Sequence, residues 1–188
     1  NQSRRQRQMC IRDRVKESFT NASLEFETIN IKIDSTEWIE AHEQLRDEFN
    51  LKFFSWLSAV DWDNDVSVGE APKEKVVPCF EVISCLSNVE NTNLVTVSTT
   101  IDKLEPKIDS LLDVYEGANW HEREAYEMFG ISFTNHPNLE KLYLPDGYEG
   151  NPMLKSFELI SREVKPWPGD VDVEGMPEDS EGGESADG

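Results

Sequence analysis

The segment from Ser132 to Phe157 is the part of the sequence that most limits how this chain can fold. Proline lacks the backbone N–H that a helix interior or a central strand requires, and glycine favours turns. Its helix-breaking and strand-breaking residues are Pro137, Pro145, Gly147, Gly150 and Pro152. The same segment carries Leu139, Leu142, Tyr143, Leu144 and Tyr148 at irregular spacing. A long extended loop with so many apolar side chains is expected to pack against another surface, most simply that of a partner protein.

A short helix rich in charged and aromatic residues is predicted just before this loop, over residues 119–129. Asn119 is a candidate N-cap, Glu122 at the third position would complete the cap, and Gly130 can end the helix in the left-handed conformation. Charged side chains among large aromatic rings are costly to bury. A specific contact, with a partner surface or a reacting group, is therefore expected to retain them.

The carboxylates of this helix have two competing interpretations. As catalytic acids, one of Glu122, Glu124 and Glu127 could have a raised pKa if buried beside aromatic rings. However, Glu122 and Glu124 diverge by about 200 degrees around the helix, so they would not act on one substrate atom. The structural interpretation gives Glu122 to the cap, pairs Arg123 with Glu127 at i, i+4, and turns Tyr126 and its neighbouring rings inward.

A metal site is a further possibility, because His121 and His136 lie fifteen residues apart. A zinc-protease helix needs histidines at i and i+4 with a glutamate base, but Ala125 stands four residues after His121. A free-standing metal-dependent hydrolase that uses these histidines and the glutamates is therefore the weakest alternative.

The residues before this region predict strands and helices in alternation. Residues 24–33 alternate apolar and polar side chains, as expected of one strand, and a helix with Asp34 as its N-cap follows. Residues 76–86 and 94–101 predict two strands that pair as a hairpin across the turn-rich residues 87–93.

Another helix is predicted to begin at Pro106 and to end at Gly117. Its apolar face would be Ile108, Leu111, Leu112 and Tyr115. The expected fold is therefore α+β: a small mixed or antiparallel sheet with packed helices, followed by the extended partner-binding loop and a disordered acidic tail.

Length and charge divide the chain into one domain with two unlike ends. Residues 1–16 carry six Lys/Arg and one Asp, a basic composition that suggests a non-native or disordered segment. Residues 17–165 would form the domain, with the docking loop at 131–165. Residues 166–188 read as a disordered acidic tail.

A formal net charge of -20 and the short apolar runs limit the possible partners. An acidic field repels nucleic acid, so no nucleic-acid partner is expected. The apolar runs fall short of the roughly 20 residues that span a bilayer, so membrane contact would run through a partner. Cys10, Cys79 and Cys85 have no CxxC spacing, which argues against a zinc ribbon or an iron–sulfur site. The lack of a signal-peptide core favours the cytoplasm.

A longer ordered motif runs through the helix and the loop. It consists of a Glu-Arg-Glu helix, an aromatic-x-Met-Phe-Gly turn, a His-Pro loop, a Leu-Pro-Asp step and a Gly-x-Pro-x-x-Lys close. Its members are Glu122, Arg123, Glu124, Tyr126, Met128, Phe129, Gly130, His136, Pro137, Leu144, Pro145, Asp146, Gly150, Pro152 and Lys155. In this motif the chain resembles the 30 kDa subunit family, the C-type subunits, of the respiratory NADH:quinone oxidoreductase, complex I. The resemblance covers roughly residues 24–167, and residues 165–169 resemble the actinobacterial branch.

Three positions depart from the usual family pattern. Glu127 stands where Asp is common, Asn151 where the loop usually has His, and Leu154 where Arg is frequent. The missing arginine puts one charged partner contact in doubt. The resemblance makes Glu127 and the motif residues other than Met128 the candidate partner-binding residues.

The resemblance implies a non-catalytic structural subunit of the peripheral arm, supporting electron transfer from NADH to quinone. It would hold no cofactor or metal, since NADH, quinone, FMN and iron–sulfur clusters would belong to other subunits. It would dock on the subunits equivalent to D and B, at the cytoplasmic side of the bacterial plasma membrane. The equivalent subunit of a membrane-bound hydrogenase or a deazaflavin-dependent dehydrogenase is the alternative.

Overall fold

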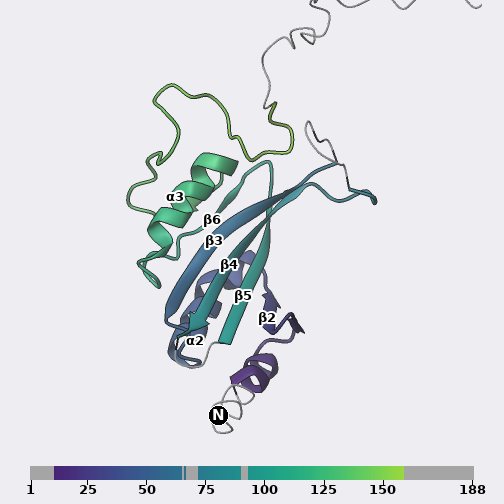
Figure 1. Ribbon diagram of the computed structural model, residues 1–188, viewed down its shortest axis with the longest axis vertical. Coiled ribbons are helices and arrows are strands. Elements are labelled where there is room, and N and C mark those ends of the chain that lie inside the picture. The colour runs from purple at the N-terminus through teal and green to yellow at the C-terminus, as the bar shows by residue number, and fades with distance from the viewer. Residues whose placement is uncertain (1–10, 65, 67–71, 90–92, 159–188) are drawn as a thin grey trace, which may run out of the picture.

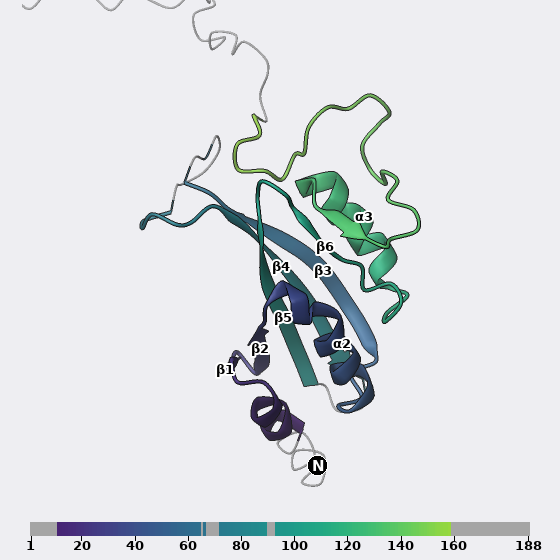
Figure 2. The same ribbon diagram turned by 180° about the vertical axis from the view of Figure 1, so that it is seen from behind.

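The computed structural model describes residues 11–64, 66, 72–89 and 93–158. Figures 1 and 2 show a twisted sheet with helices beside it and an extended segment that follows the last helix. The elements are β1 (Ala22–Glu25), β2 (Thr28–Lys32), the 3-10 helix η1 (Ser35–Glu37), α2 (Trp38–Asp47), β3 (Phe53–Trp62), β4 (Cys79–Asn88), β5 (Asn93–Asp102), β6 (Lys107–Asp109), α3 (Ala118–Phe129) and β7 (Ser132–Thr134).

The main sheet has five strands in the order β1-β2-β5-β4-β3. β2 and β5 run parallel, and the other neighbouring strands run antiparallel. β4 and β5 form the expected hairpin, with Val82 opposite Thr99. A second, two-stranded parallel sheet joins β6 to β7. The α+β prediction with a mixed sheet is confirmed.

α2 and α3 pack on the same face of the main sheet. α2 reaches this face through His42, whose ring contacts Ser84 of β4. α3 reaches it through Phe129, whose ring lies 6.3 Å from that of Phe80, also on β4. Figure 2 shows α2 in front of β4 and β5, whereas in Figure 1 it lies behind them. The core therefore lies between this face and the two helices.

His42 joins α2 to the centre of the sheet. Its Nδ1 lies 2.6 Å from the Trp38 carbonyl oxygen, and its Nε2 lies 2.7 Å from Ser84 Oγ. A carbonyl only accepts, so Nδ1 carries the proton and Nε2 accepts from the Ser84 hydroxyl. Burial lowers the pKa of His42 to about 4, so the ring is neutral at neutral pH.

Residues 24–33 form two strands, so the prediction of one strand is wrong. Phe26 and Glu27 reverse the chain with φ angles of 47° and 64°, and β1 pairs back onto β2. Such a turn is usually made by Gly or Asn. Because neither residue is present, the alternating pattern did not reveal it.

The helix predicted over residues 106–117 is also wrong. Lys107 to Asp109 form β6, and a single turn follows in which the Tyr115 N–H donates to the Leu111 carbonyl at 2.7 Å. Ile108, Leu111 and Tyr115 are all buried, so their spacing fits a helix although the backbone is not helical. Pairing with β7, over twenty residues later, decides the conformation.

The start of the described chain differs from the expectation of a disordered basic segment. Residues 11–18 are helical, and Val15 is fully buried in the core, so this end of the basic segment is ordered. Cys10 and the acidic tail at 166–188 lie outside the described residues. Among the helices that the structure describes, none is long and apolar enough to cross a membrane.

Replacing Ser84 with alanine tests the contact between α2 and the sheet. Ser84→Ala leaves the buried His42 Nε2 without its donor and is expected to lower the free energy of unfolding by about 1–3 kcal/mol in urea titrations. Ser98→Ala, on the opposite face of the sheet, is the matched control and should change it by less than about 0.5 kcal/mol. Equal effects of the two changes would show that the contact between His42 and Ser84 adds nothing to the free energy of unfolding.

Candidate docking site

The loop after β7 is held against α3 by its backbone, and we call residues 136–157 the strap. Glu127 of α3 is 2% exposed, and its carboxylate accepts three consecutive backbone N–H groups. These come from Leu142 at 2.9 Å, Tyr143 at 3.0 Å and Leu144 at 2.7 Å. Burial alone would raise the pKa of Glu127, but the three donors stabilise the carboxylate and lower its pKa overall.

Arg123 holds the strap one turn earlier on α3. Its Nε donates to the Glu140 carbonyl at 2.9 Å, and its Nη2 donates to the Lys141 carbonyl at 3.4 Å. The predicted ion pair between Arg123 and Glu127 is therefore wrong, since each side chain binds backbone groups of the strap. Local spacing on a helix could not show that a distant segment competes for both.

The end of α3 is closed by the strap. Gly130 has φ 78°, which confirms the predicted left-handed end of the helix. Asn151 Nδ2 donates to the Glu127 carbonyl at 2.9 Å, and the Met153 N–H donates to the Met128 carbonyl at 3.0 Å. These bonds satisfy helix carbonyls that have no partner within α3. A Cβ at Gly130 would lie 3.0 Å from Asn151 Oδ1, so a side chain there would crowd this closure.

The far end of the strap is tied to the main sheet. The Lys155 N–H donates to Asp61 Oδ2 at 2.9 Å. Asp61, on β3, is 2% exposed, and its other oxygen accepts from Lys103 Nζ at 2.5 Å. Sequence reasoning missed Asp61 as a functional residue. The available signal was a charged residue between the apolar positions of a strand, where burial requires a partner.

The strap also packs against itself near this end. Gly150 has φ 89°, and the Phe157 ring lies so close that a Cβ at Gly150 would be 2.9 Å from it. The rings of Tyr148 and Phe157 stack with centroids 6.3 Å apart. The motif glycine therefore permits a close approach as well as a turn.

Glu122 does not cap α3, as the sequence predicted, but points into the core. It is fully buried, and its carboxyl group accepts from Ser110 Oγ and from the Leu111 N–H, both at 2.6 Å. α3 begins after Gly117 without a side-chain cap, so the predicted Asn119 cap is also wrong. Burial raises the pKa of Glu122 to about 7, although both hydrogen bonds oppose the shift.

His136, the first residue of the strap, lies beside this carboxyl group. Its Nδ1 accepts the Asn138 N–H at 3.1 Å, so the ring proton is on Nε2. Nε2 lies 3.9 Å from Glu122 Oε2. Burial lowers the pKa of His136, the Asn119 carbonyl opposes that shift, and the Arg123 charge adds to it. At neutral pH the neutral ring therefore lies beside the buried carboxyl group, at the start of the strap.

The remaining motif residues divide by exposure. Tyr126 is half-buried against the core and Phe129 is buried in it, as predicted. Glu124, Leu144 and Pro152 are half-buried, whereas Pro137, Pro145, Asp146, Gly150 and Lys155 are exposed. The strap also presents Leu142, Tyr143 and Met153 outward, with exposed fractions of 36%, 64% and 55%. The charged side chains of Glu122, Arg123 and Glu127 thus bind groups within the chain, whereas the strap exposes Leu142, Tyr143 and Met153 beside charged residues such as Asp146 and Lys155.

The histidines lie against different neighbours. The ring of His121 is 5.8 Å from that of Phe54, whereas His136 faces Glu122. In the part of the chain that the structure describes, there is no group of three or more His, Cys, Asp or Glu side chains that could hold a metal ion.

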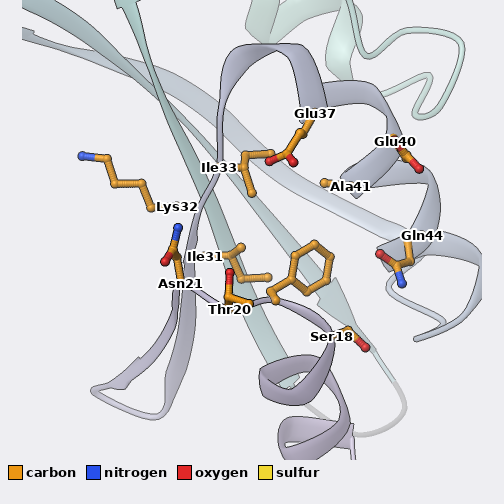
Figure 3. Close-up of a pocket in the computed structure, with 11 residues that line it drawn as sticks. Ser18, Thr20, Asn21, Ile31, Lys32, Ile33, Glu37, Glu40, Ala41 and Gln44 are labelled. Atoms are coloured by element: carbon orange, nitrogen blue, oxygen red, sulfur yellow. The ribbon is translucent and has the colours of Figure 1, made fainter.

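A hollow of about 250 Å³ lies elsewhere, between residues 18–21, β2 and α2. Figure 3 shows Glu37 and Glu40 on one side of it and Thr20 and Asn21 on the other. None of the motif residues lines this hollow, so it belongs to a different part of the molecule.

Comparison with known proteins decides the family. Residues 31–163 match the family described as "Respiratory-chain NADH dehydrogenase, 30 Kd subunit". The chain belongs to this family. The match runs from the end of β2 through α2, α3 and the strap, so it covers all the residues of the candidate site described above.

Relatives of this 30 kDa family member come from several bacterial groups. The C-type subunit of NADH-quinone oxidoreductase from Citrifermentans bemidjiense is 30% identical over 160 residues, which cover 83% of this chain and 92% of the relative. The C-type subunit from a Roseiflexus species is 36% identical over 122 residues, which cover 64% of each chain. The chain therefore spans nearly all of one relative and just under two thirds of the other.

Two solved structures share the fold of this 30 kDa family member. A trypsin-resistant fragment of Nqo5 matches with a TM-score of 0.56, covering 68% of this chain and 98% of the fragment. A chain of the archaeal membrane-bound sulfane sulfur reductase matches with a TM-score of 0.64, covering 79% of this chain and 84% of that one. Both are 20% identical in sequence, so they establish the α+β fold alone.

Glu127→Gln is expected to loosen the strap. The amide keeps one acceptor oxygen but turns an NH₂ group toward backbone N–H donors, so at least one charge-assisted bond is lost. Local opening should rise about tenfold, which limited trypsin digestion at Lys141 would measure as faster cleavage. Glu124→Gln, three residues earlier on the same helix, is the control. Unchanged cleavage in the Glu127 variant would contradict the anchoring role.

Glu122→Gln is expected to change how stability depends on pH. The pKa of Glu122 is about 7 in the fold and about 4.5 when unfolded, so the folded state retains a proton that the unfolded state releases. Glu122 therefore costs stability progressively as pH rises from about 4.5 to 7, by roughly 2–3 kcal/mol. The Tm of the glutamine variant relative to wild type should rise over this range. A constant difference would contradict the raised pKa.

Proposed function

We propose that this chain is a non-catalytic structural subunit in the peripheral arm of NADH:quinone oxidoreductase. It docks on the subunits equivalent to D and B through the outer surface of the strap. In this way it supports electron transfer from NADH to quinone, at the cytoplasmic side of a bacterial plasma membrane and with no membrane contact of its own. The partner-binding residues are the exposed members of the motif together with Leu142, Tyr143 and Met153.

One observation supports this proposal: the backbone of the strap is held from inside by side chains of the domain, while three of its large apolar side chains, Leu142, Tyr143 and Met153, are exposed. Arg123, Glu127 and Asn151 bind its backbone, and Asp61 binds its far end. Tyr143 is 64% exposed directly beside the three anchored amides. A surface whose backbone is already ordered loses little conformational entropy on binding, and exposed aromatic residues are frequent centres of binding energy.

The contribution to the reaction is positioning. NADH, FMN, iron–sulfur clusters and quinone are bound by other subunits, and this chain holds its neighbours at fixed spacing. Electron transfer requires cofactors at defined positions, which rigid supporting elements supply. The buried Glu122 and His136 lie next to each other where the strap begins, with Oε2 and Nε2 3.9 Å apart.

A second candidate is the equivalent subunit of a related respiratory complex, such as a membrane-bound hydrogenase or a deazaflavin-dependent dehydrogenase. This candidate is supported by the fold that the chain shares with a chain of the archaeal sulfane sulfur reductase. A gene for an NADH-binding flavoprotein subunit beside the gene for this chain would support the first candidate, and its replacement by a hydrogenase or deazaflavin subunit would support the second.

Affinity purification from native membranes tests the proposal. A tagged copy of the chain should retain the other respiratory subunits, including those equivalent to D and B. Tyr143→Ser should reduce the retained D-like subunit by about tenfold, because it removes an exposed aromatic contact without touching the anchors. Val77→Ser is the matched control, since Val77 is 83% exposed but lies outside the strap.

Two outcomes would count against this role. Recovery of the tagged chain without any other respiratory subunit would refute membership of the complex. Full retention of the D-like subunit by the Tyr143 variant would instead refute docking through the strap, while leaving membership of the complex intact.

A further inference from the structure

The main sheet has a second face, opposite α2 and α3, that none of the described helices covers (Figure 1). Side chains alternate along a strand, so this face receives every second residue of β4 and β5. The same holds for β3, except that an irregularity between Phe54 and Trp56 shifts the alternation by one residue, so that Phe53 and Trp56 share this face. On β4 the residues toward the helices include Phe80 and Ser84, and those toward the open face include Glu81 and Ile83.

Apolar side chains on the open face are concentrated on β3 and β4, and we call this group the β3–β4 stripe. It consists of Phe53, Trp56, Val60 and Trp62 on β3 with Ile83 and Cys85 on β4. Three of its large rings are only partly covered, with exposed fractions of 53% for Phe53, 39% for Trp56 and 40% for Trp62. Three exposed aromatic residues along one edge strand are unusual in a chain with 30% charged residues.

Apart from Leu94 at the start of β5, which is 42% exposed, the rest of the open face is polar. β5 presents Thr96, Ser98 and Thr100 there, and the Thr96 hydroxyl donates to Asn30 Oδ1 on β2 at 2.5 Å. The apolar part is therefore two strands wide, about 10 Å, and ten residues long, about 33 Å. One α-helix of about 20 residues has these dimensions.

Charge at the two ends of the stripe gives such a helix a direction. Near Trp62, the Glu81 carboxylate accepts from the indole N–H at 2.9 Å, so this end is acidic. Near Phe53, the exposed Lys52 borders a hollow of about 380 Å³. Helix N-termini favour acidic neighbours and C-termini favour basic ones. A bound helix would begin near Trp62 and end near Lys52.

A second copy of this chain is a poor occupant. Each copy carries a net charge of -20, so two copies would repel each other. The end of the strap also lies close to the stripe, across the edge strand β3. Lys155 binds Asp61, whose side chain points toward the helices, and the next residue, Trp62, points to the open face. A partner seated on the strap reaches the stripe around this edge without crossing the acidic surface of α2.

We propose that the β3–β4 stripe is a docking site for one amphipathic helix of a partner subunit, running antiparallel to β3. The proposal rests on membership of the respiratory complex, and it adds a second contact surface to the strap. Trp56 and Val60 lie at its centre, and Phe53 and Trp62 mark its ends.

Photo-cross-linking in the assembled complex tests the helix directly. p-Benzoylphenylalanine is placed at position 56 or 60 in the stripe, at 98 in the polar part of the same face, and at 143 in the strap. Positions 56 and 60 lie about 13 Å apart along a strand, which equals about nine residues of a helix. We expect both to cross-link to one partner peptide, at sites about nine residues apart, with the site reached from 60 earlier in the sequence. Position 98 should not reach that peptide.

Each other result overturns the proposal. Sites about four residues apart would indicate an added β-strand, and equal cross-linking from 98 would indicate a broad surface. Cross-links to a second copy would indicate self-association. Cross-links from position 143 without any from 56 or 60 would support the contact at the strap and refute the docking site on the stripe. No cross-link from any position would also count against membership of the complex.

Side-chain variants give a second readout. Trp56→Ser should reduce the partner retained with the tagged chain by about tenfold, whereas Thr100→Ala, exposed on the same face, should leave it unchanged. The Tm of each variant is compared with that of wild type. Unchanged retention by Trp56→Ser contradicts the proposal, and if that variant does not fold, the cross-linking result decides.

Discussion

The architecture around the strap depends on one requirement, that backbone N–H groups removed from water must find acceptors. The strap contains three prolines and has no neighbouring strand whose carbonyl groups could accept these hydrogen bonds. Glu127 meets the requirement for three consecutive amides with one carboxylate, and Asp61 meets it at the far end. These hydrogen bonds fix the backbone of an irregular segment, as ladder hydrogen bonds fix the backbone of a strand.

This arrangement reverses the first interpretation of the motif. Charged residues on a helix suggest an active site or an ionic contact with a partner, yet Glu122, Arg123 and Glu127 all bind groups within the chain. The exposed apolar side chains left for partners are Leu142, Tyr143 and Met153 on the strap, and the β3–β4 stripe on the other side of the sheet. Apolar contact area suits a subunit that remains in one assembly.

The sequence predicts those parts of the fold that local rules decide. The β4–β5 hairpin, the extent of α3 and the left-handed Gly130 follow from alternation, apolar spacing and the preference of glycine for positive φ. The failures share a nonlocal cause. The residues after Pro106 form β6 because β7 pairs with them, and Glu122 leaves the helix start because Ser110 and Leu111 lie beside it. No local pattern contains these partners, and the family resemblance named the motif without showing which way its side chains point.

Because Glu127 recognises backbone amides, the identity of the side chains on residues 142–144 is not part of the anchor. Substitutions at these positions can accumulate without releasing the loop, provided that they are not proline. The partner-facing chemistry is thus free to evolve separately from the conformation that displays it. Because one fixed carboxylate holds the backbone, the side chains at these positions can change as a neighbouring subunit changes. The loop that displays them keeps the same conformation.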